Sequence, residues 1–251
     1  VGREGFVDEM MRLFDRSLKG DVVPDEPHAV IVQEAGGRWR GEDAWPPPDS
    51  TPFTMPLLGG NYLDAPGNFS GDDIGVDFPT DFPTGSTPLE GRGSWTFTQP
   101  LPYDVHLSGA PGLTLETDGR SPSKVVALLY DVAPDGSALM ISRGASKLGP
   151  TGNVGFELSM QDWRVAQGHR LGLLLTGADD LWYDPTDTSL RPIHAIAGAL
   201  SLPALRIART SFIDGERGTR WGEIKHPISV GLSTITRRTK PADLPPPQEP
   251  S

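Results

Sequence analysis

The sequence contains no cysteine, so it can form neither a disulfide nor a zinc–thiolate site, and it has no thiolate nucleophile. Positive charge is scarce as well, because 22 Lys and Arg stand against 33 Asp and Glu, a formal net charge of −11. Binding to a phosphate backbone needs a basic surface, so we expect no nucleic-acid partner. No apolar run approaches the ~18 residues of a membrane span, so we expect no membrane partner. Cytoplasmic and secreted bacterial locations both stay open.

The motif that carries a serine hydrolase nucleophile is also missing. That motif, Gly-x-Ser-x-Gly, places the serine on a strained turn between a strand and a helix. The nearest segment, Gly144-Ala-Ser-Lys-Leu148, has leucine in place of the last glycine. We therefore expect no catalytic residue in this chain.

The histidines and acidic clusters do not predict a metal site. His169 follows a glycine between two predicted strands, so we interpret it as a structural turn residue. The other four histidines show no metal-binding spacing and are interpreted as surface or partly buried residues. Two groups of loop aspartates offer oxygen ligands for Ca²⁺ but lack EF-hand spacing, and we interpret them as solvated acids. The residues concerned are His28, His106, His194 and His226, with Asp72, Asp73, Asp77, Asp179, Asp180, Asp184 and Asp187. We expect no metal and no cofactor.

Glycine and proline are abundant, at 30 and 26 residues, about twice their usual share. Such a composition disfavours a helical bundle and favours short strands joined by turns. The stretch Lys124–Val132 is apolar on both faces, which predicts a central strand. Strands are predicted at 28–34, 53–58, 61–63, 95–98, 104–108, 112–117, 123–132, 137–142, 155–159, 170–176, 192–196, 202–208 and 228–233. This pattern is typical of an antiparallel β-sandwich.

One amphipathic helix is predicted before the strands, over residues 4–19. An apolar stripe of Phe6, Met10, Leu13 and Phe14 runs along it at helical spacing. Gly20 stands in the position of a C-terminal cap. A lone amphipathic helix needs a surface to cover, and the neighbouring sequence offers no partner helix.

Three stretches resemble the X-prolyl dipeptidyl aminopeptidase family of serine hydrolases, which includes cocaine esterase and α-amino-acid ester hydrolases. The first is Phe14-Asp-Arg-Ser-Leu-Lys-Gly-Asp21, and the second is the Trp-Arg … Trp-Pro segment within 32–47. The third spans 97–184 and includes Leu128-Leu-Tyr-Asp-Val-Ala-Pro-Asp-Gly136 and Ala178-Asp-Asp-Leu-Trp-Tyr-Asp-Pro185. Together they cover about residues 5–210, whereas 48–94 and the end after 210 match poorly.

The resemblance implies a C-terminal non-catalytic jelly-roll of the galactose-binding-like type, packed against the α/β-hydrolase domain of the same polypeptide. The family's serine, aspartate and histidine would all precede residue 1, as in an excised or processed fragment. On this reading 1–21 is the last helix of the hydrolase domain, and 22–94 is a linking strand with an extended excursion. Residues 95–236 form the sandwich, and 237–251 an extended or disordered tail. Domain docking is assigned to the helix stripe with Trp39 and Trp45, and a possible pocket rim to Trp182 and Tyr183.

The predicted role is therefore an accessory one, which stabilises a dipeptidyl-peptidase or esterase domain and helps to shape its substrate pocket. A carbohydrate-binding module is the alternative, because the sandwich and its aromatic residues, Trp182 above all, permit sugar stacking. An independent structural or adhesion domain is a third hypothesis. The helix at 4–19 counts against both, since a free-standing module has no use for it. If that helix is exposed, the chain could also form homo-oligomers.

Overall fold

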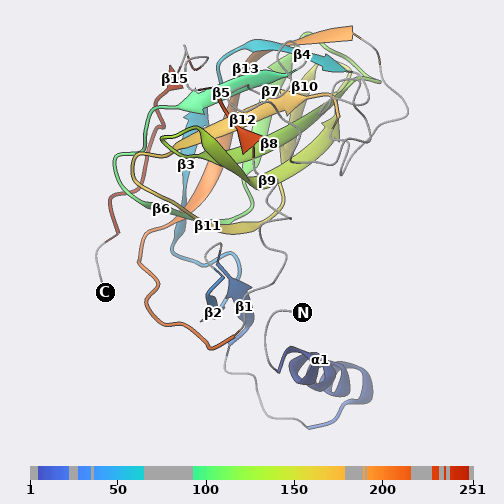
Figure 1. Cartoon of the computed structure of the whole chain (residues 1–251). Coiled ribbons are helices and arrows are strands. Elements are labelled where there is room, and N and C mark those ends of the chain that lie inside the picture. Colours follow the sequence, from blue (N-terminus) through green and yellow to red (C-terminus); the bar gives the residue numbers. More distant parts are fainter. Residues whose placement is uncertain are drawn as a thin grey trace.

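The computed structural model of this protein describes residues 5–22, 28–34, 37–64, 93–178, 189, 191–215, 228–231, 235 and 238–248. These residues form an antiparallel β-sandwich with one helix apart from it (Figure 1). The helix α1 (Phe6–Phe14) continues as a π-helical turn, η1 (Asp15–Lys19), and ends at Gly20 in the left-handed conformation. The predicted helix and its glycine cap are confirmed. Neither described helix has the length and apolar character of a membrane span.

The strands follow in chain order after the helix. They are β1 (Val30–Gln33), β2 (Trp39–Glu42), β3 (Ser50–Pro56), β4 (Gly60–Asp64), β5 (Ser94–Thr98), β6 (Val105–Gly109), β7 (Gly112–Thr117), β8 (Lys124–Val132), β9 (Ser137–Lys147), β10 (Asn153–Glu157), β11 (Gln161–Val165), β12 (Arg170–Thr176), β13 (Arg191–Leu205), β14 (Ile228–Ser229) and β15 (Arg238–Thr239).

Two sheets make up the sandwich, and a separate hairpin of β1 and β2 lies at one end of it (Figure 1). The seven-stranded sheet runs β10-β7-β13-β6-β11, with β3 and β4 also paired to β13. The six-stranded sheet runs β14-β9-β8-β12-β5-β15. All pairings are antiparallel except that of β15 with β5. The predicted antiparallel sandwich is therefore confirmed.

The core lies between the two sheets, where alternate residues of each strand point inward. In β7, Leu113 and Leu115 are buried while Thr114 and Glu116 are exposed. Every residue of β8 is buried, and β8 lies between β9 and β12, so its predicted central position is confirmed. The second apolar face of β8 is covered as well, on the side away from the other sheet. A smaller cluster there includes residues from the C-terminal part, among them Ile228, Val230 and Ile235.

Some strand boundaries differ from the prediction. The two strands predicted at 192–196 and 202–208 are one strand, β13, because the stretch between them holds a register shift near Ala197 rather than a turn. Strand β11 was not predicted, since its sequence Gln-Asp-Trp-Arg-Val mixes charges with apolar residues. Both errors have the same cause: tertiary pairing supports strand residues whose own sequence signal is weak.

The C-terminal tail is extended over the described residues 238–248 and is held against the sandwich by hydrogen bonds. After β15, the backbone of Ala242 exchanges two hydrogen bonds with Thr54 of β3, at 2.9 and 2.8 Å. Farther on, the Tyr103 hydroxyl donates to the carbonyl of Pro245, and Gln248 Nε2 donates to the carbonyl of Leu205 at 2.9 Å. Together with the pairing of β15 to β5, these contacts join the tail to both sheets, which its proline-rich composition did not predict.

Candidate domain-docking site

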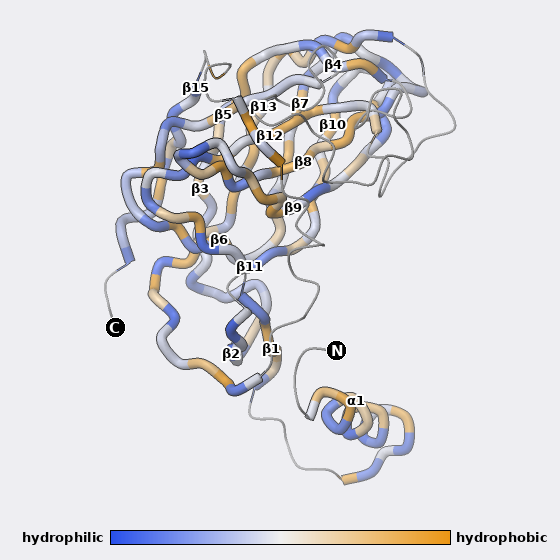
Figure 2. The backbone as a smooth tube through the Cα atoms, viewed as in Figure 1, coloured by the Kyte–Doolittle hydropathy of each residue, from blue (hydrophilic) through white to orange (hydrophobic). Residues whose placement is uncertain are grey.

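The apolar stripe of the N-terminal helix is not covered by the rest of the described chain. Phe6, Leu13 and Phe14 are 43, 56 and 43 % exposed, Met10 is half-buried, and no residue of α1 is fully buried. Figure 1 shows α1 away from the sandwich, and Figure 2 shows hydrophobic residues along its length. Contiguous exposed apolar surface is typical of interaction sites in soluble proteins.

The two tryptophans assigned to docking lie in and after the β1–β2 hairpin. Trp39 belongs to β2, and its carbonyl accepts a hydrogen bond from the amide of Ile213 at 2.7 Å. Trp45 is half-buried, and its indole Nε1 lies 3.2 Å from the sulfur of the exposed Met160. Trp182 and Tyr183 lie outside the described residues, as do the two groups of loop aspartates.

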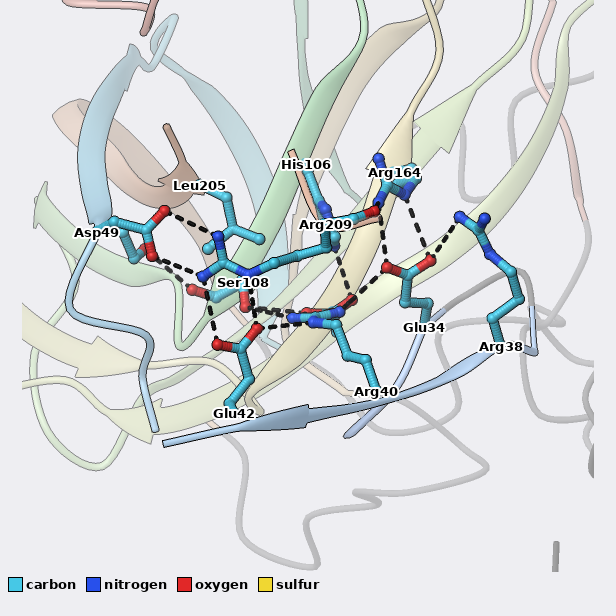
Figure 3. A network of polar contacts seen from close by, with 12 residues as sticks. Glu34, Arg38, Arg40, Glu42, Asp49, His106, Ser108, Arg164, Leu205 and Arg209 are labelled. Atoms are coloured by element: carbon cyan, nitrogen blue, oxygen red, sulfur yellow. Dashed lines mark hydrogen bonds and ion pairs between the residues drawn. The ribbon is translucent and has the colours of Figure 1, made fainter. Parts of the chain in front are cut away.

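A buried network of charges joins the hairpin to the sandwich, and the sequence analysis did not predict it. We call it the Arg40 cluster (Figure 3). Its members are Glu34, Arg38, Arg40, Glu42, Asp49, His106, Ser108, Asp162, Arg164 and Arg209. Four arginines face four carboxylates, so the formal charges of these eight groups cancel.

Arg40 is the centre of the cluster, with a side chain that is 1 % exposed. Its guanidinium donates from both terminal nitrogens to Asp162 of β11, with the contact from Nη1 to Oδ1 at 2.7 Å. Its Nε donates to Glu42 at 2.7 Å, and Nη1 also reaches Glu34 at 3.2 Å. A bidentate pair of this type fixes the relative orientation of the guanidinium and the carboxylate as well as their distance, because both groups are planar.

Asp162 is held from its own side by strand β6. The imidazole Nε2 of His106 donates to Oδ1 at 2.7 Å, and the Ser108 hydroxyl donates to Oδ2 at 2.9 Å. Burial opposes the ionisation of Asp162, but hydrogen bonds and charge from Arg40 and His106 outweigh it and hold the pKa at about 2. Asp162 is therefore a fixed anion on the sandwich against which Arg40 docks.

Two further ion pairs flank the centre. On one side, Glu34 accepts from Arg164 at 3.1 Å and from Arg38 at 2.9 Å. Burial would raise the pKa of Glu34, but the bond and charge of Arg164 and the other nearby cations lower it. Because Glu34 lies beside the hairpin and Arg164 belongs to β11, this pair also spans the joint.

On the other side, Arg209 links the hairpin to the sandwich a second time. It donates to Glu42 at 2.8 Å and to both oxygens of Asp49, at 2.6 and 3.0 Å. The bond from Arg209 lowers the pKa of Asp49, and the bond to Asp49, opposed by burial, raises the pKa of Arg209. Both groups are thus charged across the neutral range.

Glu34, His106 and Asp162 form the one group in the described part of the chain whose ligand atoms lie close enough for a metal, within 4.8 Å of one another. Arg40 already bonds both carboxylates of that group. A metal ion at this place would have to displace the guanidinium from a buried position. The two carboxylates therefore bind the guanidinium of Arg40 in place of a metal ion.

The histidines have different roles from one another. His169 bonds Asp131 at 2.7 Å through Nδ1 and forms backbone bonds around Gly168 and Leu101, which confirms a structural turn residue. His106 was interpreted as a surface or partly buried residue, and this is wrong because it is 2 % exposed within the Arg40 cluster. Its burial follows from its place on β6 opposite Arg164 of β11.

A shallow groove of about 470 Å³ lies over β7, β10 and β13. It is lined by Thr114, Leu115, Glu116, Asn153, Val154, Gly155, Ala197 and Gly198. No aromatic ring is among these residues, so the groove lacks the stacking surface by which aromatic side chains hold sugar rings. It gives no support to carbohydrate binding.

The chain is therefore a β-sandwich with an exposed amphipathic helix and with a hairpin joined to it through buried charges. A family model described as the X-Pro dipeptidyl-peptidase C-terminal non-catalytic domain matches residues 22–193. The match covers more than half of the sequence, and this chain belongs to that family. A search of the curated proteins found no significant match.

Several solved structures share the fold. A CocE/NonD family hydrolase from Staphylococcus aureus has 13 % sequence identity and a TM-score of 0.57, with 80 % of this chain and 46 % of that chain covered. An aminopeptidase from a marine sediment Thaumarchaeota archaeon has 18 % identity and a TM-score of 0.51, covering 80 % and 44 %. An α-amino acid ester hydrolase has 16 % sequence identity and a TM-score of 0.53, with 78 % of this chain and 44 % of that chain covered. This chain spans less than half the length of each.

Proposed function

We propose that this chain is the accessory β-sandwich of a serine hydrolase of the X-Pro dipeptidyl-peptidase type. In this role it binds the α/β-hydrolase domain of the same polypeptide, stabilises that domain and helps to shape its substrate pocket. The family match to a non-catalytic C-terminal domain supports the assignment. We also propose that the sandwich is a jelly-roll of galactose-binding-like type, that the hydrolase domain ends at residue 21, and that Trp182 and Tyr183 lie at the rim of the substrate pocket.

The observation that carries this proposal is the exposed stripe of α1. Leu13 and Phe14 are 56 and 43 % exposed on a helix that has no buried residue. Full burial of such a side chain contributes roughly 1.5–3 kcal/mol before the cost of ordering is subtracted. A docked hydrolase domain would supply that burial, and the helix would then be part of its surface.

Binding between two separately produced parts tests the proposal directly. The hydrolase portion of the parent polypeptide is titrated with this chain in a calorimeter, and its melting temperature is measured with and without the chain. We expect binding together with a rise in melting temperature. The double variant Leu13→Gln with Phe14→Gln should weaken binding at least tenfold. Glutamine preserves helix propensity, and Arg16→Gln on the exposed helix surface is the matched control.

Activity assays complete the test. The full-length polypeptide and this chain are compared on Ala-Pro-p-nitroanilide and p-nitrophenyl acetate. We expect hydrolysis by the full-length protein and none by the chain alone, since the described residues present no nucleophile elbow. Turnover by the isolated chain, or the absence of any binding to the hydrolase portion, would overturn the proposed function.

A further inference from the structure

The β1–β2 hairpin has few backbone bonds to the sandwich. Its two strands pair only with each other in a two-stranded sheet. Among the described residues, one isolated bridge, between Trp39 and Ile213, extends it. Ladder hydrogen bonds therefore cannot fix how the hairpin is directed relative to the sandwich. The side chains of the Arg40 cluster have to do this.

We propose that Arg40 is a positioning residue, which fixes the direction of the β1–β2 hairpin against the sandwich. The inference rests on the proposed function for its effect on catalysis. Its structural part stands alone, because it concerns only the joint between β2 and β11.

Burial separates Arg40 from the other arginines of the cluster. Its side chain is 1 % exposed, against 17 % for Arg209, 35 % for Arg164 and 50 % for Arg38. Exposed ion pairs are weakened by water and salt, whereas buried pairs are screened much less. The Arg40–Asp162 pair is thus the contact across the joint that solvent weakens least.

The chemistry of this contact favours a role in orienting the hairpin rather than in stabilising the fold. A well-packed apolar pair in the same place could stabilise a protein as much as a buried ion pair does. An apolar contact is not directional, however, and lets two surfaces slide. The planar guanidinium of Arg40 meets a carboxylate that His106 and Ser108 already hold in place, so a rotation of the hairpin breaks hydrogen bonds at once.

Hydrogen exchange on this chain tests the structural part. In Arg40→Ala, we expect the amides of β1 and β2 to lose at least tenfold more protection than the amides of β8 and β12, which report global unfolding. Guanidinium chloride at a few millimolar, far below denaturing concentrations, should restore protection by occupying the vacated place, and sodium chloride at equal concentration should not. Arg206→Ala, at an exposed arginine of the adjoining segment, is the control and should match the wild type.

Arg40→Lys keeps the positive charge but cannot form the bidentate hydrogen bonds of a guanidinium. It replaces Arg40→Ala in this test if that variant does not fold. We expect intermediate exchange in the hairpin and an unchanged sandwich. Unchanged hairpin exchange in Arg40→Ala, or an Arg40→Lys variant equal to the wild type, would overturn the inference.

The catalytic consequence is measured in the full-length polypeptide. Arg40→Lys should raise KM for Ala-Pro-p-nitroanilide several-fold and leave kcat within twofold, because the pocket wall shifts while the reacting groups do not. A merely structural role would lower the amount of active enzyme and leave KM unchanged, which would overturn the catalytic part. Failure of the proposed function is a different result, in which the hydrolase portion does not bind this chain whatever the exchange data show.

Discussion

Replacing Asp162 by asparagine perturbs the centre of the Arg40 cluster with almost no change in volume. The wild-type carboxylate accepts bonds from Arg40, His106 and Ser108. An asparagine keeps one acceptor oxygen and leaves a buried guanidinium with less negative charge around it. Removing one partner of a buried ion pair typically costs about 3–5 kcal/mol. We expect a loss of that order in the free energy of unfolding at pH 7.

The pH dependence of stability isolates the contribution of the Asp162 carboxylate. The pKa of Asp162 is about 2 in the folded chain, against 3.8 for the free side chain. At about 1.4 kcal/mol per pH unit, this difference contributes roughly 2–3 kcal/mol to folding. Because the folded pKa is the lower one, the contribution is fully present above about pH 4 and is lost as the pH falls toward 2. About half of it remains at pH 3.

Urea unfolding followed by tryptophan fluorescence, at several pH values from 7 to 3, measures this contribution. The stability gap between the wild type and Asp162→Asn should narrow by about 1 kcal/mol over that range. Glu157→Gln removes an exposed carboxylate of β10 and is the control, with a small and pH-independent effect expected. A gap that stays constant from pH 7 to pH 3 would refute the conclusion that Asp162 is the ionised anchor of the cluster.

Three further outcomes are expected. Removing residues 241–251 should lower the free energy of unfolding by about 1–3 kcal/mol in urea titrations, because the tail loses partly buried hydrogen bonds such as that from Tyr103; unchanged stability would contradict the attachment of the tail. Tyr62→Phe should cost about 1–3 kcal/mol by the same assay, because the Tyr62 hydroxyl donates to the buried carbonyl of Lys124 at 2.9 Å; a neutral effect would show that this bond is dispensable. Light scattering should show concentration-dependent association of the chain that disappears when residues 1–21 are removed; equal masses for both forms would contradict an adhesive helix.

The sandwich could be predicted from the sequence because its strands alternate in hydrophobicity or, like β8, are apolar throughout. Turn residues supplied the remaining boundaries, as at Gly136 and Gly168, which both have positive φ. Strand β13 shows the limit of this approach. A register shift near Ala197 looks like a break in the sequence, but the neighbouring β7 pairs on both sides of it.

The Arg40 cluster could not be predicted in the same way. Once the structure is known, a pattern in the sequence can be related to the cluster. Arg40 and Glu42 share one face of a strand, as do Asp162 and Arg164. The pairing of Arg40 with Asp162 spans 122 residues, however. No periodicity links two short charged strands so far apart, and an isolated charged residue in a sequence predicts solvent exposure. The interpretation of His106 as a surface residue failed for this reason.

The distribution of exposed apolar residues indicates where a partner would bind. Of the twelve large hydrophobic residues exposed in the described parts, seven lie between residues 6 and 22, in or just after the helix. Phe212 lies under the guanidinium of Arg38 beside the hairpin, at 3.9 Å from guanidinium carbon to ring centre, and Met160 contacts Trp45. The outer face of β8 is instead buried under C-terminal residues. Exposed apolar surface is therefore concentrated at the hairpin end of the sandwich and on the helix beyond it. A partner held there would contact the sandwich across the Arg40 cluster, which makes the rigidity of that joint the property that most affects the geometry of the proposed complex.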